Sequence, residues 1–372
     1  MKIFMIANMY PSKRYPSYGV FVKNHLEMLE VLGFHVDKLV MKKRMSKFFK
    51  SLAYLSFYLR IICKLLFQKQ AVLYIHYASH VAWLICLIKK WKPELRIIVN
   101  LHGSDVFPET KLQQNLQNQV KKLVQQAEKV VVPSAYFETV VMQKYTISQE
   151  KIFISPSGGI NLAIFKPKKL GNDKRETRQE ILLGYVGRID VGKGWEDVLR
   201  AFTALKKAGT ARWKLIMIGS GKEDEKKQSL AEELHIQSDV EFRPLIPQHD
   251  LPNYYRKFDC FLFPTRRKGE SLGLVGLEAM ACGTPVIGSQ IAGLESYLEN
   301  GKNGFFYPPG DVGALISVLN QFAQLSEEQV SMLSKEAILT AEKYDRRLVK
   351  RNFESFMIGF MGENKKAPAR LS

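Results

Sequence analysis

Residues 181–198 read ILLGYVGRIDVGKGWEDV and contain the clearest structural signal in the chain. This stretch begins with an apolar run of strand length, ILLGYV, and continues through a turn that contains Gly187, Gly192 and Gly194. Apolar residues then recur at helical spacing from Trp195 onward. A strand, a glycine-rich turn and a helix in direct succession are the repeating unit of a parallel α/β sheet.

The same alternation runs along the rest of the chain. The strand-like runs before this stretch are KIFMIANMY, HVDKLVM, AVLYIHY, RIIVNLHG and KVVVPS, and those after it are WKLIMIGSG, VEFRPL, CFLFPT and TPVIGS. Helix-length connections separate them, which predicts parallel sheets with helices on both faces. The expected fold class is α/β, with two doubly wound Rossmann-like domains facing across a cleft at the carboxyl ends of their strands.

The length of the chain, 372 residues, also favours two domains. A polar, highly charged segment at 166–179 is typical of a linker. We therefore expect a first domain over 1–170 and a second over 171–345. Residues 346–372 should form a C-terminal helix that returns to the first domain.

The net charge of +19 is divided unevenly between the two halves. Residues 1–170 carry 26 Lys and Arg against 9 Asp and Glu, whereas residues 171–372 carry 29 against 27. Between Asp37 and Glu94 there is no acidic residue at all. The first domain should therefore present a strongly basic field.

Composition excludes several classes of protein. Hydrophobic residues make up 46% and charged residues 24%, which is ordinary globular composition. No apolar run predicts a transmembrane span or an export signal, so we expect a cytoplasmic protein. The cysteines are far apart with no CxxC pair, which favours a reducing compartment over a disulfide framework or a zinc site; they are Cys63, Cys86, Cys260 and Cys282.

The turn at 187–193 resembles a phosphate-binding loop. It matches most of the pattern GxxxxGK, but Gly194 stands where Ser or Thr would hold Mg²⁺, which disfavours a P-loop NTPase. Arg188 and Lys193 remain as cations that follow a strand, suited to neutralising a diphosphate. The alternative is that both are solvated cations on a turn.

Two carboxylates follow in the segment 264–288, PTRRKGESLGLVGLEAMACGTPVIG. Glu270 is expected in a loop and Glu278 on the first turns of a helix that begins near Leu274. Carboxylates beside the N-terminus of a helix, where a phosphate can bind, are suited to accepting hydrogen bonds from sugar hydroxyls. The alternative is that Glu278 forms an ion pair and Glu270 caps the helix.

These motifs together resemble the GT-B glycosyltransferases of family four, the group 1 enzymes that transfer sugars from sugar nucleotides with retention. The resemblance rests on GRIDVGKG, ESLGLVGLEAMACGTPVIGS and AGLESYLENGKNGFFYPPGD, and it extends to PSGGINLAIFKP, HGSD at 102–105 and the opening YPSKRYPSYGVFVKNH. It implies a hexosyltransferase that uses a UDP- or GDP-linked sugar. No Asp-x-Asp motif occurs, so neither a metal nor another cofactor is expected.

The resemblance also implies roles for residues of the second domain. Arg188 and Lys193 would bind the donor diphosphate, and Glu278 would hold the ribose hydroxyls. Glu270 would hold hydroxyls of the transferred sugar and count as catalytic. The remaining donor contacts would be the backbone amides of Leu272, Gly273 and Leu274 at the phosphate and the strand end from Arg243 to Leu245 at the base.

Two residues of the first domain complete the implied site. His102, directly after the strand RIIVNL, would donate a hydrogen bond to the sugar and so count as catalytic. A structural histidine is the alternative. Gly19 would lie in a loop that approaches the phosphate closely.

Residues 42–69 combine basic with aromatic and aliphatic residues at helical spacing. A basic amphipathic helix of this kind suits an anionic membrane surface. The sequence therefore predicts peripheral attachment to the cytoplasmic membrane face and a lipid-linked glycan or glycolipid acceptor, in polysaccharide or glycoconjugate biosynthesis. The alternative is a solvated helix whose apolar side packs on the sheet. Nucleic acid is disfavoured, because the aromatic residues are not interleaved as stacking platforms.

Two other functions remain as alternatives. A membrane-surface interaction protein with an inactive transferase fold would retain the same architecture. A nicotinamide-dependent oxidoreductase is disfavoured, because no GxGxxG follows the first strand.

Overall fold

The structure is a computed structural model that describes residues 2–15, 18–44, 46–67, 72–167, 180–209 and 211–362. The chain forms two compact units, one of residues 1–158 with 349–372 and one of residues 159–348. The boundary expected at 170/171 and most of the linker expected at 166–179 lie outside the described residues. The contacts divide the chain earlier, at Gly158/Gly159.

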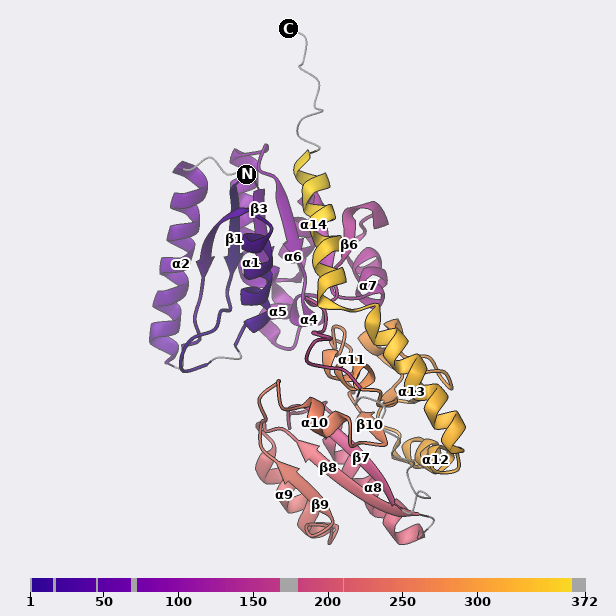
Figure 1. Cartoon of the computed structure of the whole chain (residues 1–372). Helices are drawn as coiled ribbons and strands as arrows, with labels where there is room; N and C mark the ends of the chain where they lie inside the picture. The colour runs from indigo at the N-terminus through magenta and orange to yellow at the C-terminus, as the bar shows by residue number, and fades with distance from the viewer. Residues whose placement is uncertain are drawn as a thin grey trace. The chain divides into compact units, whose positions relative to one another are not determined.

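In the described part of unit 1, six parallel strands form one sheet in the order β2-β1-β3-β4-β5-β6 (Figure 1). Helices connect successive strands, and the last helix of the chain, α14, joins this unit. The strands are β1 (Lys2–Ala7), β2 (His35–Val40), β3 (Val72–His76), β4 (Ile97–Asn100), β5 (Lys129–Val132) and β6 (Ile152–Ile154). The helices are α1 (Val20–Val31), α2 (Lys47–Phe67), η1 (Ala78–His80), α3 (Ala82–Trp91), α4 (Gly103–Val106), α5 (Lys111–Asn115), α6 (Gln117–Gln126), α7 (Ala135–Tyr145), η2 (Gln149–Lys151) and α14 (Arg346–Gly362).

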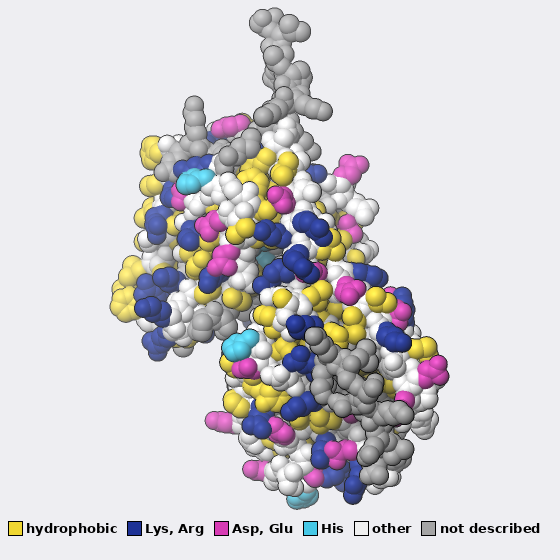
Figure 2. All heavy atoms as spheres, viewed as in Figure 1, with side chains coloured by type: hydrophobic (Ala, Val, Ile, Leu, Met, Phe, Trp, Pro, Cys, Tyr) yellow, Lys and Arg dark blue, Asp and Glu magenta, His cyan; other side chains and the backbone are white. Residues whose placement is uncertain are grey.

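Helix α2 lies on an outer side of unit 1, and its outward face is both apolar and basic (Figures 1 and 2). The inward face carries the buried residues Phe57, Ile61 and Leu65. No helix among the described residues is long and apolar enough to cross a membrane.

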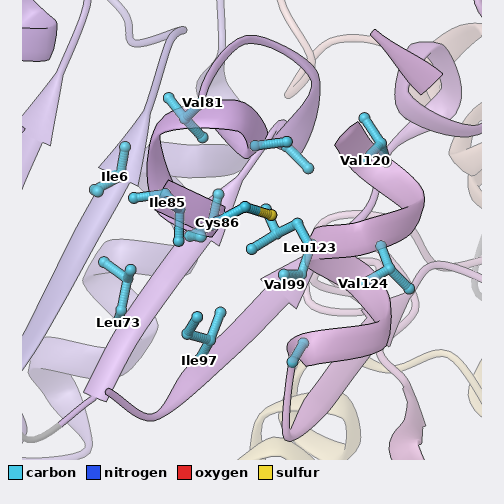
Figure 3. Packing of buried hydrophobic residues seen from close by; sticks show 14 of the residues in the cluster. Ile6, Leu73, Val81, Ile85, Cys86, Ile97, Val99, Val120, Leu123 and Val124 are labelled. Carbon is cyan, nitrogen blue, oxygen red and sulfur yellow. The ribbon is translucent and has the colours of Figure 1, made fainter. Parts of the chain in front are cut away.

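Alternating residues of the unit 1 strands point to two separate cores. On one face Ile6, Leu73 and Val99 pack with α3 and α6, as Figure 3 shows. On the other face β1, β3 and β4 pack against α1 and α14. Strands buried on both faces are apolar at nearly every position, which is why they appear as continuous hydrophobic runs in the sequence.

In the described part of unit 2, six parallel strands form a second sheet in the order β12-β11-β10-β7-β8-β9. The strand order reverses between β7 and β10, and such a switch point is where open α/β sheets bind ligands. The strands are β7 (Glu180–Val186), β8 (Arg212–Ile218), β9 (Val240–Arg243), β10 (Cys260–Phe263), β11 (Val286–Ser289) and β12 (Gly304–Tyr307). The helices are α8 (Trp195–Ala208), α9 (Asp224–Glu233), α10 (Pro252–Tyr255), α11 (Leu274–Ala281), η3 (Ala292–Ser296), α12 (Val312–Ala323) and α13 (Glu327–Glu342).

The two sheets confirm the predicted α/β fold class with two doubly wound Rossmann-like domains. The sequence did not predict β6 and β12, which are only three and four residues long. Length alone does not explain this, since β4, β5, β9, β10 and β11 are also four residues long and were predicted.

Candidate functional site

The turn between β7 and α8 packs directly against the end of β10. Gly194 precedes α8 with a φ of 71°, and a Cβ placed there would lie 1.8 Å from the carbonyl oxygen of Pro264. Only glycine combines this left-handed conformation with so close an approach. The turn that carries Lys193 is therefore fixed beside the loop that carries Glu270, at the switch point of the sheet.

Lys193 and Glu270 form an ion pair in this place. The Lys193 Nζ donates to Glu270 Oε2 at 2.6 Å, and the Thr265 hydroxyl donates to the same oxygen at 3.2 Å. Both charged side chains are about 15% exposed. Burial alone would raise the pKa of Glu270, but the Lys193 ammonium, with Arg267 and the Thr265 hydroxyl, holds it below its ordinary value. Glu270 is therefore a carboxylate at neutral pH.

Arg188 lies at the same strand end but faces solvent. Its side chain is 62% exposed, and its Nη1 donates to Asp190 Oδ2 at 2.7 Å. The Tyr185 hydroxyl donates to the backbone oxygen of Arg188, and Asp190 also accepts from the backbone of Lys222. The backbone is thus held in place while most of the guanidinium remains available to an anion.

Glu278 lies on α11 and is almost completely buried, with 4% of the residue exposed. Gln248 Nε2 donates to its Oε1 at 2.7 Å, and the Tyr255 hydroxyl donates to its Oε2 at 3.2 Å. Burial raises the pKa of Glu278 to about 7, and these two hydrogen bonds only partly oppose that shift. The two side chains that donate to Glu278 are both neutral. They are not the cation that the alternative considered from the sequence, an ion pair, would require.

The residues before α11 are fixed by packing. Gly273 is the N-cap with a φ of 77°, so Glu270 does not cap this helix. A Cβ on Gly273 would lie 2.4 Å from the Phe263 ring. The Leu272 side chain is buried, and Leu274 is the first residue of the helix. In the first turn the backbone N–H of Gly276 donates to the Gly273 oxygen at 3.0 Å. The N–H groups of Leu274 and Val275 precede it, at positions where a helix has no intrahelical acceptor to offer.

Arg243 and Leu245 lie at and after the end of β9. Arg243 Nε donates to Glu241 Oε1 at 2.5 Å, and Leu245 is 76% exposed. The loop between β9 and α10 also carries Gln248, which reaches back to Glu278. The exposed Leu245 and the Gln248 that donates to Glu278 thus lie on one loop, which begins directly after Arg243.

In unit 1, His102 follows the end of β4 and stacks with other rings. Its Nε2 lies 3.1 Å from His76 Nδ1, and its ring centroid lies 4.7 Å from that of Tyr77. Burial lowers the pKa of His102 to about 3, so the ring is neutral at ordinary pH. A neutral imidazole can donate or accept one hydrogen bond at each nitrogen but carries no charge.

Asp105 holds the turn in which His102 lies. This buried carboxylate accepts from the backbone N–H of His102 at 3.2 Å and from the Ser79 hydroxyl at 2.7 Å. Burial raises the pKa of Asp105 to about 6 against the effect of these hydrogen bonds. The aspartate of the HGSD motif therefore joins the turns after β3 and β4.

Gly19 is the N-cap of α1 with a φ of 74°. A Cβ there would lie 2.8 Å from the carbonyl carbon of Met9. Close packing on the loop after β1 therefore requires a glycine at this position.

Sequence reasoning missed several residues of these two sites. His76 is the last residue of β3, and Thr265 comes two residues after β10, so their position after strands was an available signal. Gln248 lies within a loop and Tyr255 at the end of α10, and no spacing pointed to them. Among the residues that the structure describes, no group of three or more His, Cys, Asp or Glu side chains could hold a metal ion.

Residues 168–339 match the family model described as Glycosyl transferases group 1. Among curated proteins, a D-inositol 3-phosphate glycosyltransferase from Thermomonospora curvata is 30% identical over 214 residues, covering 52% of this chain and 49% of that protein. One from Saccharomonospora viridis is 29% identical over 239 residues, covering 61% and 54%. The chain thus spans about half the length of the curated relatives it matches.

Solved structures match over nearly the whole chain. Sucrose-phosphate synthase from Thermosynechococcus elongatus superposes with a TM-score of 0.76 at 18% identity, covering 98% of this chain and all of that one. The Anabaena protein Alr3699/HepE, solved in complex with UDP, gives 0.73 at 15% identity, covering 96% of this chain and all of that one. These likenesses confirm the predicted GT-B fold class.

Proposed function

We propose that this chain, whose residues 168–339 match the family model of the glycosyl transferases group 1, is a retaining, metal-independent hexosyltransferase. Its donor would be a nucleoside-diphosphate sugar linked to UDP or GDP. The observation that carries this proposal is the ion pair of Lys193 with Glu270 at the switch point of unit 2, on the same sheet edge as Arg188. The UDP complex of the neighbour Alr3699/HepE supports a nucleotide donor.

Donor binding in this proposal uses three kinds of group. Arg188 and Lys193 neutralise the diphosphate, together with the N-terminus of α11 at Leu272, Gly273 and Leu274. Glu278 accepts from the ribose hydroxyls, and Glu270 accepts from hydroxyls of the transferred sugar. The base lies at the loop from Arg243 to Leu245.

The chemistry depends on stabilising the leaving diphosphate. As the bond between the sugar and the phosphate breaks, negative charge develops on the phosphate, and fixed cations and helix N–H groups stabilise it without a metal. The leaving phosphate takes the proton of the acceptor hydroxyl as the new bond forms on the same face of the sugar. His102, in unit 1, donates a hydrogen bond to a sugar hydroxyl, for which its neutral state is suited.

Titration calorimetry against UDP, GDP, ADP and NAD, each with and without EDTA, tests the donor. We expect micromolar binding of UDP or GDP that EDTA does not change and that Glu278→Ala removes. Binding of NAD alone, or of none of the four, would overturn the proposal and favour an inactive transferase fold. Binding that EDTA abolishes would overturn metal independence.

The acceptor is assigned from the outward face of unit 1. Tyr58 of α2 and Trp83 of α3 lie with ring centroids 5.5 Å apart, so the two helices share one surface. Exposed apolar patches of this extent are typical of interaction sites. The exposed apolar residues are Phe48, Phe49, Leu52, Leu55, Leu59, Leu66 and Phe67 on α2 and Trp83, Leu87 and Trp91 on α3.

Cations surround this apolar face. Lys50 and Arg60 of α2 are exposed, as are Lys42, Lys43 and Arg44 before it. Apolar residues that insert below the headgroups and cations that attract them are the two requirements for peripheral binding to an anionic membrane. This supports attachment to the cytoplasmic membrane face and a lipid-linked glycan or glycolipid acceptor in polysaccharide or glycoconjugate biosynthesis. The relatives named as D-inositol 3-phosphate glycosyltransferases suggest a phosphate-bearing polyol as the competing acceptor.

Vesicle flotation tests whether the protein binds an anionic membrane. We expect recovery with vesicles that contain phosphatidylglycerol, little recovery with phosphatidylcholine alone, and loss at high salt or in a Phe48→Ser, Leu52→Ser, Leu55→Ser variant. The matched control is Met332→Ser, Leu339→Ser, which removes exposed apolar residues of α13 in unit 2 and should float like the wild type. Equal recovery with neutral and anionic vesicles would overturn binding to an anionic surface, and recovery with neither would overturn membrane attachment and favour the soluble acceptor.

A further inference from the structure

Both oxygens of the Glu278 carboxylate accept a hydrogen bond from another side chain of unit 2. Gln248 Nε2 donates to Oε1 and the Tyr255 hydroxyl to Oε2, so each oxygen has one donor. A carboxylate buried without donors is costly, and two donors lower that cost. These two donors stand where the two hydroxyls of a ribose would otherwise be expected.

The two donors differ in how firmly they are held. Tyr255 is fully buried, its ring packs against Phe258 and Phe261, and its backbone oxygen accepts from the Thr284 hydroxyl at 2.5 Å. It is therefore a fixed part of the core. Its bond to Glu278 persists whether or not a ligand is bound.

Gln248 is held much less firmly. It lies in the loop between β9 and α10, and it is exposed together with its neighbours Pro247 and His249. Its amide nitrogen donates to Glu278 Oε1. An exposed glutamine side chain has many solvated rotamers, so it leaves the carboxylate at little cost once another donor is offered.

We infer that Gln248 is a built-in competitor of the donor nucleotide, which occupies the ribose position on Glu278 and must swing out before the ribose binds. This rests on the proposed role of Glu278. Its amide N–H group substitutes for one hydroxyl of the diol, which keeps the buried carboxylate hydrogen-bonded while the site is empty. Donor affinity is thereby lower than the contacts of the bound nucleotide alone would give, because that hydrogen bond must first break.

The inference predicts that removing the Gln248 side chain raises the affinity for the nucleotide. Gln248→Ala should bind the preferred nucleoside diphosphate about three- to tenfold more tightly than the wild type. The measurement is calorimetry at pH 8.5, where Glu278 is ionised, since its pKa is about 7. The gain should be absent with the diphosphate of a 2′,3′-dideoxynucleoside, which offers no diol.

His249→Ala is the matched control. It removes the adjacent exposed side chain from the same loop and should leave the affinity unchanged. If both variants tighten binding, the loop and not the Gln248 amide is responsible, and the inference is wrong. Unchanged or weaker binding by Gln248→Ala also overturns it, since weaker binding would mean that Gln248 contacts the bound nucleotide.

The outcomes separate this inference from the proposed function. Nucleotide binding by the wild type without a gain in Gln248→Ala overturns the competitor and leaves the transferase proposal standing. Absence of binding by the wild type and the variant alike overturns both. If Gln248→Ala tightened binding of the dideoxynucleotide by the same factor, Gln248 would not compete with the diol, and the inference would be wrong.

Discussion

Two glutamates of unit 2, eight positions apart, have opposite electrostatic environments. Glu270 is paired with the Lys193 ammonium, and its pKa is lowered although the residue is buried. Glu278 has only the neutral donors Gln248 and Tyr255, and burial raises its pKa to about 7. The charge of the partner, and not the depth of burial, therefore decides which carboxylate is firmly ionised at neutral pH.

The raised pKa of Glu278 makes stability depend on pH. The unfolded carboxyl ionises near its ordinary value of 4.5, whereas the folded one ionises only near 7. Stability is therefore fully present below pH 4.5 and is lost as the pH rises through 7, by about 3 kcal/mol. We expect Glu278→Gln to be more stable than the wild type above pH 7, with little difference at pH 4, while losing nucleotide affinity.

Urea denaturation at pH 4, 6 and 8 measures this effect. The control is Glu295→Gln, an exposed glutamate for which the difference from the wild type should not grow with pH. A difference from the wild type that stays constant with pH would show that folding does not shift the pKa of Glu278, and a destabilisation that grows with pH would show that the folded protein favours the carboxylate.

At the scale of secondary structure, the β7–α8 turn depends on one glycine. The Cβ of an alanine at position 194 would lie 1.8 Å from the Pro264 oxygen, which the backbone of the two loops cannot accommodate without moving. Gly194→Ala should lose about 3 kcal/mol or more of stability and displace Lys193 from Glu270. Donor affinity should fall with it.

Gly209 offers the matched comparison. It also has a positive φ, 64°, at the end of the same helix α8, but a Cβ there meets nothing within 4 Å. Gly209→Ala should therefore cost only about 1 kcal/mol in thermal or urea denaturation. Equal losses in the two variants would mean that backbone conformation, and not the contact with Pro264, is what requires glycine at 194.

The two alternatives for the apolar residues of helix α2 also differ at the scale of secondary structure. Its periodicity predicted an amphipathic helix, and the structure has one at Lys47–Phe67. The alternative, in which the apolar side packs on the sheet, holds for the inward face, where Phe57, Ile61 and Leu65 are buried. Ala53, Tyr54, Tyr58 and Ile62 are partly buried against the same core. Phe48, Leu52 and their exposed neighbours form a second apolar row that this helix does not bury.

At the scale of the whole molecule, helix α14 packs on the sheet of unit 1, far from that sheet in the sequence. Phe353, Met357 and Phe360 of α14 pack on the face formed by β1, β3 and β4. Arg96 Nη2 donates to the backbone oxygen of Phe360 at 2.9 Å. Unit 1 is therefore built from both ends of the chain, with unit 2 inserted between them.

This arrangement predicts which unit a mutation in α14 affects. Phe353→Ala should destabilise unit 1 by about 3–5 kcal/mol, because it leaves a cavity on the sheet. Hydrogen exchange should show faster exchange in β1 and β3 and unchanged protection in β7 and β8. Ile358→Ala, on the exposed side of the same helix, should change neither. Loss of protection in both units would mean that they unfold together.

Local sequence pattern was enough to predict ten of the twelve strands that the structure describes, and the residues of the β7–α8 and β10–α11 turns. Strand, glycine turn and helix follow one another within a few residues, so Arg188, Lys193 and Glu270 could be placed after strands from local pattern alone. Only the tertiary structure decided which of these turns lie side by side. The sheet order β10-β7-β8-β9 brings Lys193 to Glu270 across 77 positions, and packing brings Gln248 and Tyr255 to Glu278. Contacts between distant segments depend on strand order and packing, for which no local period in the sequence carries a signal.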